Sequence, residues 1–137
     1  MKGEAERSAR ERSLRLLSII AIIPPLVMLV SVSASVRFGL SFSSPLVSIS
    51  AMLVALFTFL MADKISSKIL GASSLEEALS SFRKSTLMNG AVIPALGAVA
   101  ILSSRPSDAL FTALIYMVVS YSGIAASWRK LSVSLES

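Results

Sequence analysis

The carboxylate, imidazole and thiolate side chains that catalysis most often uses are scarce in this chain, and those present lie outside its apolar stretches. The 137 residues include 8 Asp and Glu, but no His and no Cys. Imidazole and thiolate groups are common metal ligands, and they supply many nucleophile–base pairs. The composition therefore predicts no catalytic residues, no metal site and no cofactor-binding residues, which indicates a protein that is not an enzyme.

Four stretches of the chain contain no charged residue, and each is as long as the roughly 20 residues that a helix needs to cross a bilayer. They cover residues 16–36, 39–62, 85–104 and 109–128. We expect an all-α polytopic membrane protein in which four long helices form two hairpins. Within this single transmembrane domain, residues 1–137, the predicted spans are about 16–36, 43–62, 86–104 and 109–128.

The absence of charge inside the predicted spans excludes several functions. Proton pumps, ion-coupled transporters and voltage sensors place ionisable residues inside the membrane, so the sequence does not indicate these classes. Asn89, the only Asn in a chain without Gln, is the strongest polar group in the spans. We expect its side chain to form a hydrogen bond between helices. The depletion of Asn and Gln is also typical of thermophile proteins.

Two of the predicted spans contain prolines far from their ends. Pro24 and Pro25 lie in the first span and Pro94 in the third. Each proline removes a backbone donor, so we expect helix kinks at these positions. The run AIIPPL at 21–26 also aligns with AVIPAL at 91–96. This alignment is consistent with a tandem repeat of one hairpin, although two unrelated spans that each hold a proline would give the same pattern.

Small residues crowd the second, third and fourth spans, where they allow helices to approach closely. This packing could lie within one chain or between subunits, and the sequence leaves both open. The residues predicted to pack helices are Ala51, Ala55, Gly90, Ala95, Gly97, Gly123 and Ser127.

Positive charge is concentrated on one side of the predicted spans. All of the 13 Lys and Arg residues except Arg37 and Arg105 fall in the N-terminal segment, the connector 63–85 or the C-terminal tail. The positive-inside rule then places both termini and this connector in the cytoplasm, in a multi-pass protein of the cell membrane. Basic residues of the connector are expected to bind anionic lipid head groups. They are Lys64, Lys68, Arg83 and Lys84.

The same connector is expected to contain an interfacial helix over about residues 75–84 that continues into the third span. Gly71 is a natural end for the helix before it. Ser74 followed by Glu77 has the spacing of a capping box at a helix start. Apolar residues then follow at helical spacing, namely Leu75, Ala78, Leu79 and Phe82.

These residues support two resemblances. The nine residues GASSLEEAL at 71–79 resemble the Gly-x-x-Leu-x-Glu-Ala-Leu motif of platform proteins in type II secretion and type IV pilus machines, whose large cytoplasmic helical domains are missing here. The whole design is similar to the hairpin pilins of conjugation-type secretion systems, including archaeal DNA-import pili. Those pilins have apolar helices, a short basic turn and no catalytic residues. They typically form one hairpin, whereas four spans are predicted here.

The resemblance to hairpin pilins implies a non-enzymatic subunit that self-assembles by helix packing into a pilus or a conduit for DNA transfer or secretion. Its partners would be membrane lipids and copies of itself or other membrane subunits. The sequence shows no basic patch interleaved with aromatic residues, so we expect no sequence-specific nucleic-acid binding. The alternatives are a small transporter or channel for a neutral or lipidic substrate, and an accessory subunit of a larger membrane complex.

Single cysteines at Ser41, Ser73 and Ser107 test the predicted topology, because the chain has no cysteine of its own. We expect an impermeant thiol reagent added outside the cell to label Ser41→Cys and Ser107→Cys, and to leave Ser73→Cys unlabelled. Labelling of Ser73→Cys together with silence at Ser41→Cys would refute the orientation.

Overall fold

The computed structural model of the chain describes residues 2–40 and 42–136, and every regular element in them is helical. Ser41, one of the labelling positions, lies outside these residues. The elements in chain order are α1 (Lys2–Ile20), α2 (Ile23–Arg37), α3 (Pro45–Leu70), α4 (Leu75–Leu87), the π-helical η1 (Met88–Val92), α5 (Ile93–Ser103), the 3₁₀-helical η2 (Pro106–Asp108) and α6 (Ala109–Glu136). The all-α prediction is therefore confirmed.

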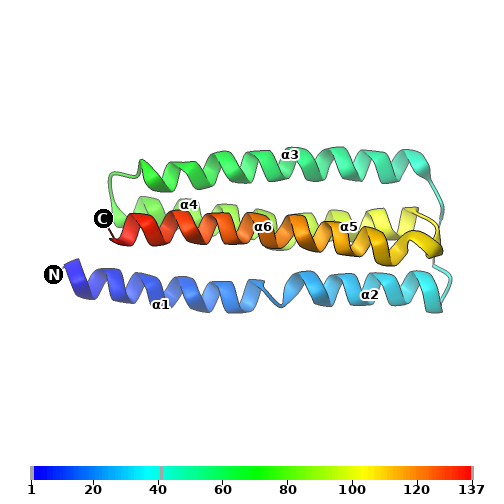
Figure 1. Ribbon diagram of the computed structural model, residues 1–137, viewed down its shortest axis with the longest axis horizontal. Helices are drawn as coiled ribbons and strands as arrows, with labels where there is room; N and C mark the ends of the chain where they lie inside the picture. Colours follow the sequence, from blue (N-terminus) through cyan, green and yellow to red (C-terminus); the bar gives the residue numbers. More distant parts are fainter. Residues whose placement is uncertain (1, 41, 137) are drawn as a thin grey trace.

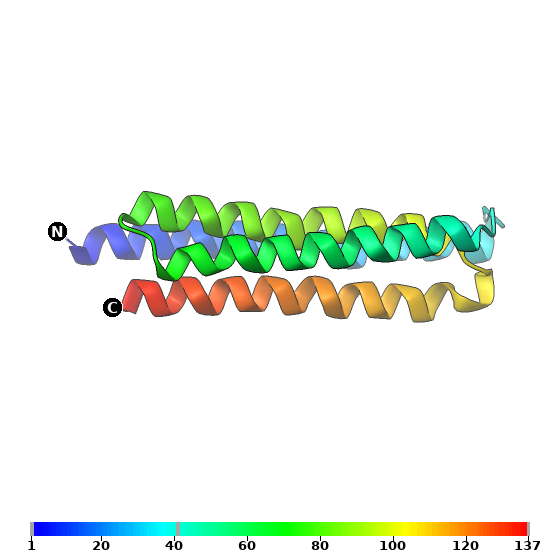
Figure 2. The same ribbon diagram turned by 90° about the horizontal axis from the view of Figure 1, so that it is seen from above.

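The helices join into four long rods that lie side by side (Figures 1 and 2). Within the described part of the chain, four segments are long and apolar enough to cross a membrane, namely Gly3–Arg37, Pro45–Leu70, Leu75–Ser103 and Pro106–Leu135. Both termini lie at the same end of the bundle as the α3–α4 connection (Figure 1). We call this the charged end, and it comprises residues 2–15, 63–84 and 129–136.

At the opposite end, the α2–α3 connection is tied to the end of α5. Gly39 has a φ of +64° just after α2, a left-handed conformation that favours glycine. The chain then donates two backbone hydrogen bonds to α5, from Phe42 to the Leu102 carbonyl at 3.1 Å and from Ser44 to the Ser103 carbonyl at 2.8 Å. The last carbonyls of a helix lack partners within it, so these bonds fasten the first hairpin to the second.

At the charged end, the start of α4 is capped by serine. The Ser74 hydroxyl accepts a hydrogen bond from the Glu77 backbone N–H at 3.2 Å. The Glu77 carboxylate in turn accepts from the Ser73 hydroxyl at 2.8 Å and from the Ser73 backbone N–H at 3.3 Å. Both bonds lower the pKa of the Glu77 carboxyl, and the bond from the Ser73 hydroxyl has the larger effect. In a standard capping box the Glu side chain would accept from the backbone N–H of the cap residue, here Ser74. In this chain it accepts from Ser73, one residue earlier.

The helices α5 and α6 form the central pair of the bundle, and α2 and α3 each pack against both of them. Gly97 lies so close to Tyr116 that an added Cβ would stand 2.9 Å from the ring, and Gly123 lies against the carboxamide of Asn89. Glycine at both positions lets the two rods approach. The rod that contains α4 and α5 consequently buries 50% of its most apolar window, more than any of the other three rods.

Buried apolar side chains form two clusters along the bundle. One lies among the apolar spans and includes Met28, Ala55, Ile93, Ile101 and Tyr116. The other lies at the charged end and consists of Ala9, Ile69, Ala78, Phe82, Leu131 and Leu135. The four rods therefore continue beyond the charge-free stretches and pack there around a second core, which was not predicted from the sequence.

Candidate functional site

Polar side chains gather where α6 faces the prolines and the η1 segment. We call this set the polar seam, and it consists of Ser85, Asn89, Ser120, Tyr121 and Ser127. All but the half-buried Tyr121 are buried. The hydroxyls of Ser85 and Ser127 share a hydrogen bond between α4 and α6. The seam contains no carboxylate, imidazole or amine, so its residues offer no acid–base pair and serve to join helices.

Tyr121 supplies a hydrogen bond that Pro25 cannot give. The helix is interrupted between α1 and α2 (Figure 1). Pro24 and Pro25 stand in the first turn of α2. In a continuous helix, the Ala21 carbonyl would accept from the backbone N–H of residue 25, which proline lacks. The Tyr121 hydroxyl donates to the Ala21 carbonyl at 2.6 Å instead. A side chain from α6 therefore satisfies a carbonyl that the kink leaves without a donor.

Ser120 donates to the carbonyl that Pro94 leaves without a donor. The helix widens to π geometry over Met88–Val92, so that each carbonyl accepts from the fifth residue on, and the Ile93 N–H bonds to the Met88 carbonyl. The Asn89 carbonyl would accept from residue 94, which has no N–H. The Ser120 hydroxyl donates to it instead. Two consecutive side chains of α6 thus serve the two mid-span proline sites.

We did not predict these roles for Ser120 and Tyr121 from the sequence. The available signal was the tyrosine itself, because a buried phenol usually takes a hydrogen-bond partner, although Tyr116 of the same span has none among the described residues.

The Asn89 side chain packs on α6 without a hydrogen bond to it. Its Nδ2 donates to the Ser85 carbonyl of its own rod at 3.1 Å, and its Oδ1 has no hydrogen-bond partner in the described part of the chain. The predicted interhelical bond of the Asn89 side chain is therefore wrong, and the Asn89 backbone carbonyl makes that contact. A cavity beside Asn89 has a volume of about 10 Å³, far below the size of a small-molecule site.

The residues predicted to pack helices face the interior of this one chain, with a single exception. Gly90 lies against Ile20, and the contacts of Gly97 and Gly123 are also within the chain. Ala95 is exposed on the outer side of α5. The buried members of the set are Ala51, Ala55, Gly90, Gly97, Gly123 and Ser127.

At the charged end, Lys130 joins α6 to α3. Its Nζ donates to the Asp63 carboxylate at 3.0 Å, to the Ser66 hydroxyl at 2.7 Å and to the Ser67 hydroxyl at 3.3 Å. This network lies near the surface, where an ion pair adds little stability. The residues predicted to bind lipid head groups are exposed at the same end, namely Lys64, Lys68, Arg83 and Lys84.

The role of the seam predicts energetic coupling between Tyr121 and Pro25. Tyr121→Phe leaves the Ala21 carbonyl without a donor, and it should lower the free energy of unfolding by about 1 kcal/mol. Pro25→Ala restores a backbone N–H, so the same Tyr121→Phe should cost much less in that background. Unfolding of the four proteins in mixed micelles gives the coupling energy.

Tyr116→Phe is the matched control, since the Tyr116 hydroxyl is buried and has no hydrogen-bond partner among the described residues. It should show no coupling to Pro25→Ala. An equal cost of Tyr121→Phe in both backgrounds would contradict the role assigned to its hydroxyl.

Comparison with known proteins returned no match to any family model, to any curated protein or to any solved structure. The function is therefore inferred from the residues and geometry of this chain, which is a polytopic membrane protein of four helices.

Proposed function

We propose that this protein is a non-enzymatic membrane subunit that assembles with copies of itself through the outer face of α5. The observation that carries the proposal is the make-up of that face, which we call the α5 outer face. It consists of Ala95, Ala98 and Val99 of α5 together with Ala91 and Val92 at the end of η1, all exposed or half-buried. Small side chains on a lipid-facing helix allow a second helix to approach closely.

The outer faces of the neighbouring rods differ from it. Exposed side chains on α3 are mostly large and include Leu53, Leu56 and Phe57, and those on α2 include Leu26 and Leu29. Such bulky faces suit contact with lipid tails. The interior glycines are already occupied by contacts within the chain, so a partner must use small residues on the surface, and the α5 outer face groups three alanines there.

The absence of reactive groups from the polar seam supports a packing role over a catalytic one. The resemblance to hairpin pilins favours a filament or a transfer conduit as the assembled form. We place the charged end in the cytoplasm, because eleven of the 13 Lys and Arg residues lie there.

A second candidate function rests on a groove between α3 and α6. The groove has a volume of about 380 Å³, and its lining is almost wholly apolar and includes Met52, Phe59, Ile115 and Val119. A groove of this kind in a bilayer could hold an acyl chain, which favours a carrier of a lipidic substrate as the alternative.

Ala95→Leu tests the assembly. The added isobutyl group stands on an exposed position, so the variant should insert and fold as the original protein does. It should reduce self-association in bilayers on the order of tenfold, because close helix contact is lost. Single-molecule photobleaching in liposomes, or analytical ultracentrifugation in mild detergent, measures the association.

Ala125→Leu is the matched control, because Ala125 is an exposed alanine on α6, away from the α5 outer face. It should leave association unchanged. Gly97→Leu is unsuitable, since the new side chain would collide with Met28 and Tyr116 inside the chain. A monomeric original protein, with substrate-dependent flux in liposomes, would replace the assembly proposal with the carrier.

A further inference from the structure

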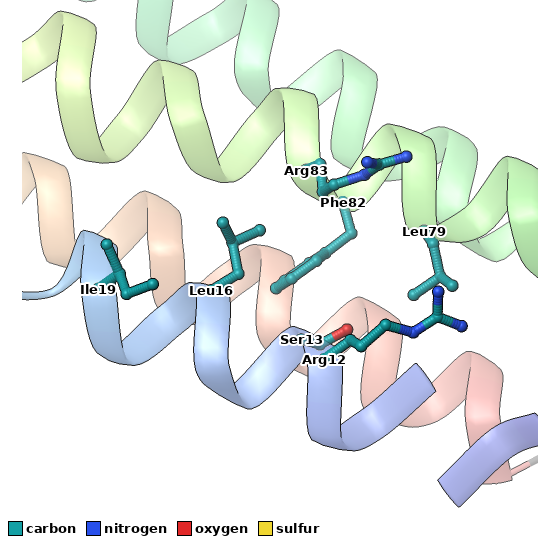
Figure 3. Close-up of a pocket in the computed structure, with 7 residues that line it drawn as sticks. All are labelled: Arg12, Ser13, Leu16, Ile19, Leu79, Phe82 and Arg83. Atoms are coloured by element: carbon teal, nitrogen blue, oxygen red, sulfur yellow. The ribbon is translucent and has the colours of Figure 1, made fainter. Parts of the chain in front are cut away.

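A pocket opens between α1 and α4 where the charged end meets the apolar spans. It has a volume of about 320 Å³. Figure 3 shows the guanidinium groups of Arg12 and Arg83 both extending toward the Leu79 end of the pocket, while Ile19 lies at the opposite end. The apolar lining comes from Leu16, Ile19, Leu79 and Phe82.

Arg12 differs from the other arginines of α1 in its helical neighbours. Arg7, Arg10 and Arg15 each have a Glu three or four positions away, where opposite charges pair on a helix. Arg12 has none, because the residues at those positions are Ser8, Ala9, Arg15 and Leu16.

Arg83 on α4 also lacks an acidic residue three or four positions away. The residues three and four positions from it are Leu79, Ser80, Thr86 and Leu87. No carboxylate lines the pocket either. Two guanidinium groups from different helices therefore stand at one pocket with no carboxylate three or four positions away on their helices, which makes the site complementary to an anion.

The order of groups along the pocket matches the order along a phospholipid in a bilayer. Arg12 precedes the first charge-free stretch, which begins at Leu16, and Ile19 lies inside it. Polar contacts thus lie at head-group depth and apolar contacts at acyl-chain depth. We propose that this pocket binds one anionic phospholipid, with its phosphate on Arg12 and Arg83 and an acyl chain along Leu16, Ile19 and Phe82.

The proposal requires that the bundle lies in a bilayer, and it is independent of assembly through the α5 outer face. It also differs from diffuse attraction of lipid by exposed lysines, because the two arginines share one pocket with an apolar floor. A free phosphate would use the arginines alone and would gain nothing from Leu16 or Ile19.

The chain carries its own reporter for this pocket. Trp128 is the only tryptophan, and its ring contacts the Phe82 ring edge-on with 6.2 Å between centroids. Because Phe82 lines the pocket, a lipid whose acyl chain carries bromine should quench Trp128 fluorescence when it is bound there.

The test uses the full chain in vesicles of phosphatidylcholine and phosphatidylglycerol, with bromine on the acyl chains of one lipid at a time. We expect stronger quenching by brominated phosphatidylglycerol than by brominated phosphatidylcholine at equal mole fraction. The double variant Arg12→Gln and Arg83→Gln should lower this preference on the order of tenfold. Both arginines are exposed, so circular dichroism should show unchanged helix content.

The control double variant is Arg7→Gln and Arg129→Gln, which removes the same net charge from the same end. It should keep the preference. Equal quenching by the two lipids in the original protein, or an equal loss in the control, would overturn the proposal. Reversal of the quenching by millimolar glycerol 3-phosphate would also overturn it, since that result would assign the site to a free phosphate.

Discussion

The need to satisfy every backbone carbonyl inside a bilayer governs this bundle. Water is absent there, so a carbonyl that loses its donor to proline must find another. The hydroxyls of Ser120 and Tyr121 donate to the Asn89 and Ala21 carbonyls, and both come from α6. Because both donors come from one helix, α6 packs against both of the rods that contain a mid-span proline. The close approach of α6 to the rod of η1 and α5 then requires glycine at positions 97 and 123.

The spans could be predicted from the sequence because they depend on a local property, the length of charge-free chain, and the missing N–H of each proline is local too. The partners of the freed carbonyls could not, since Ala21 and Tyr121 are separated by 100 residues. The side chain of Asn89 illustrates the same limit. Its polarity predicted a bond to another helix, but its amide reaches the carbonyl four residues back in its own rod.

The direction that each small residue faces was also beyond sequence reasoning. Glycine and alanine occur on several faces of spans two to four, and only the packed bundle separates those that contact Met28, Tyr116 or Asn89 from those that face lipid. That separation shapes the functional account. The interior is occupied by contacts that hold one chain together, so our proposals for interaction with other molecules rest on outward features, namely the α5 outer face, the pocket between α1 and α4 and the groove between α3 and α6.

The central claim is that the interior contacts, including the one between Ser85 and Ser127, lie within a single chain. Disulfide formation between Ser85→Cys and Ser127→Cys tests it directly, because the two hydroxyls share a hydrogen bond and the chain has no other cysteine. Oxidation should be carried out in bilayers that hold equal amounts of ¹⁴N- and ¹⁵N-labelled protein. Mass spectrometry should then find cross-linked peptides of uniform label only, and the pair Ser80→Cys and Ser127→Cys should remain reduced. Mixed-label cross-links between Ser85→Cys and Ser127→Cys, or no cross-link at all, would contradict the account.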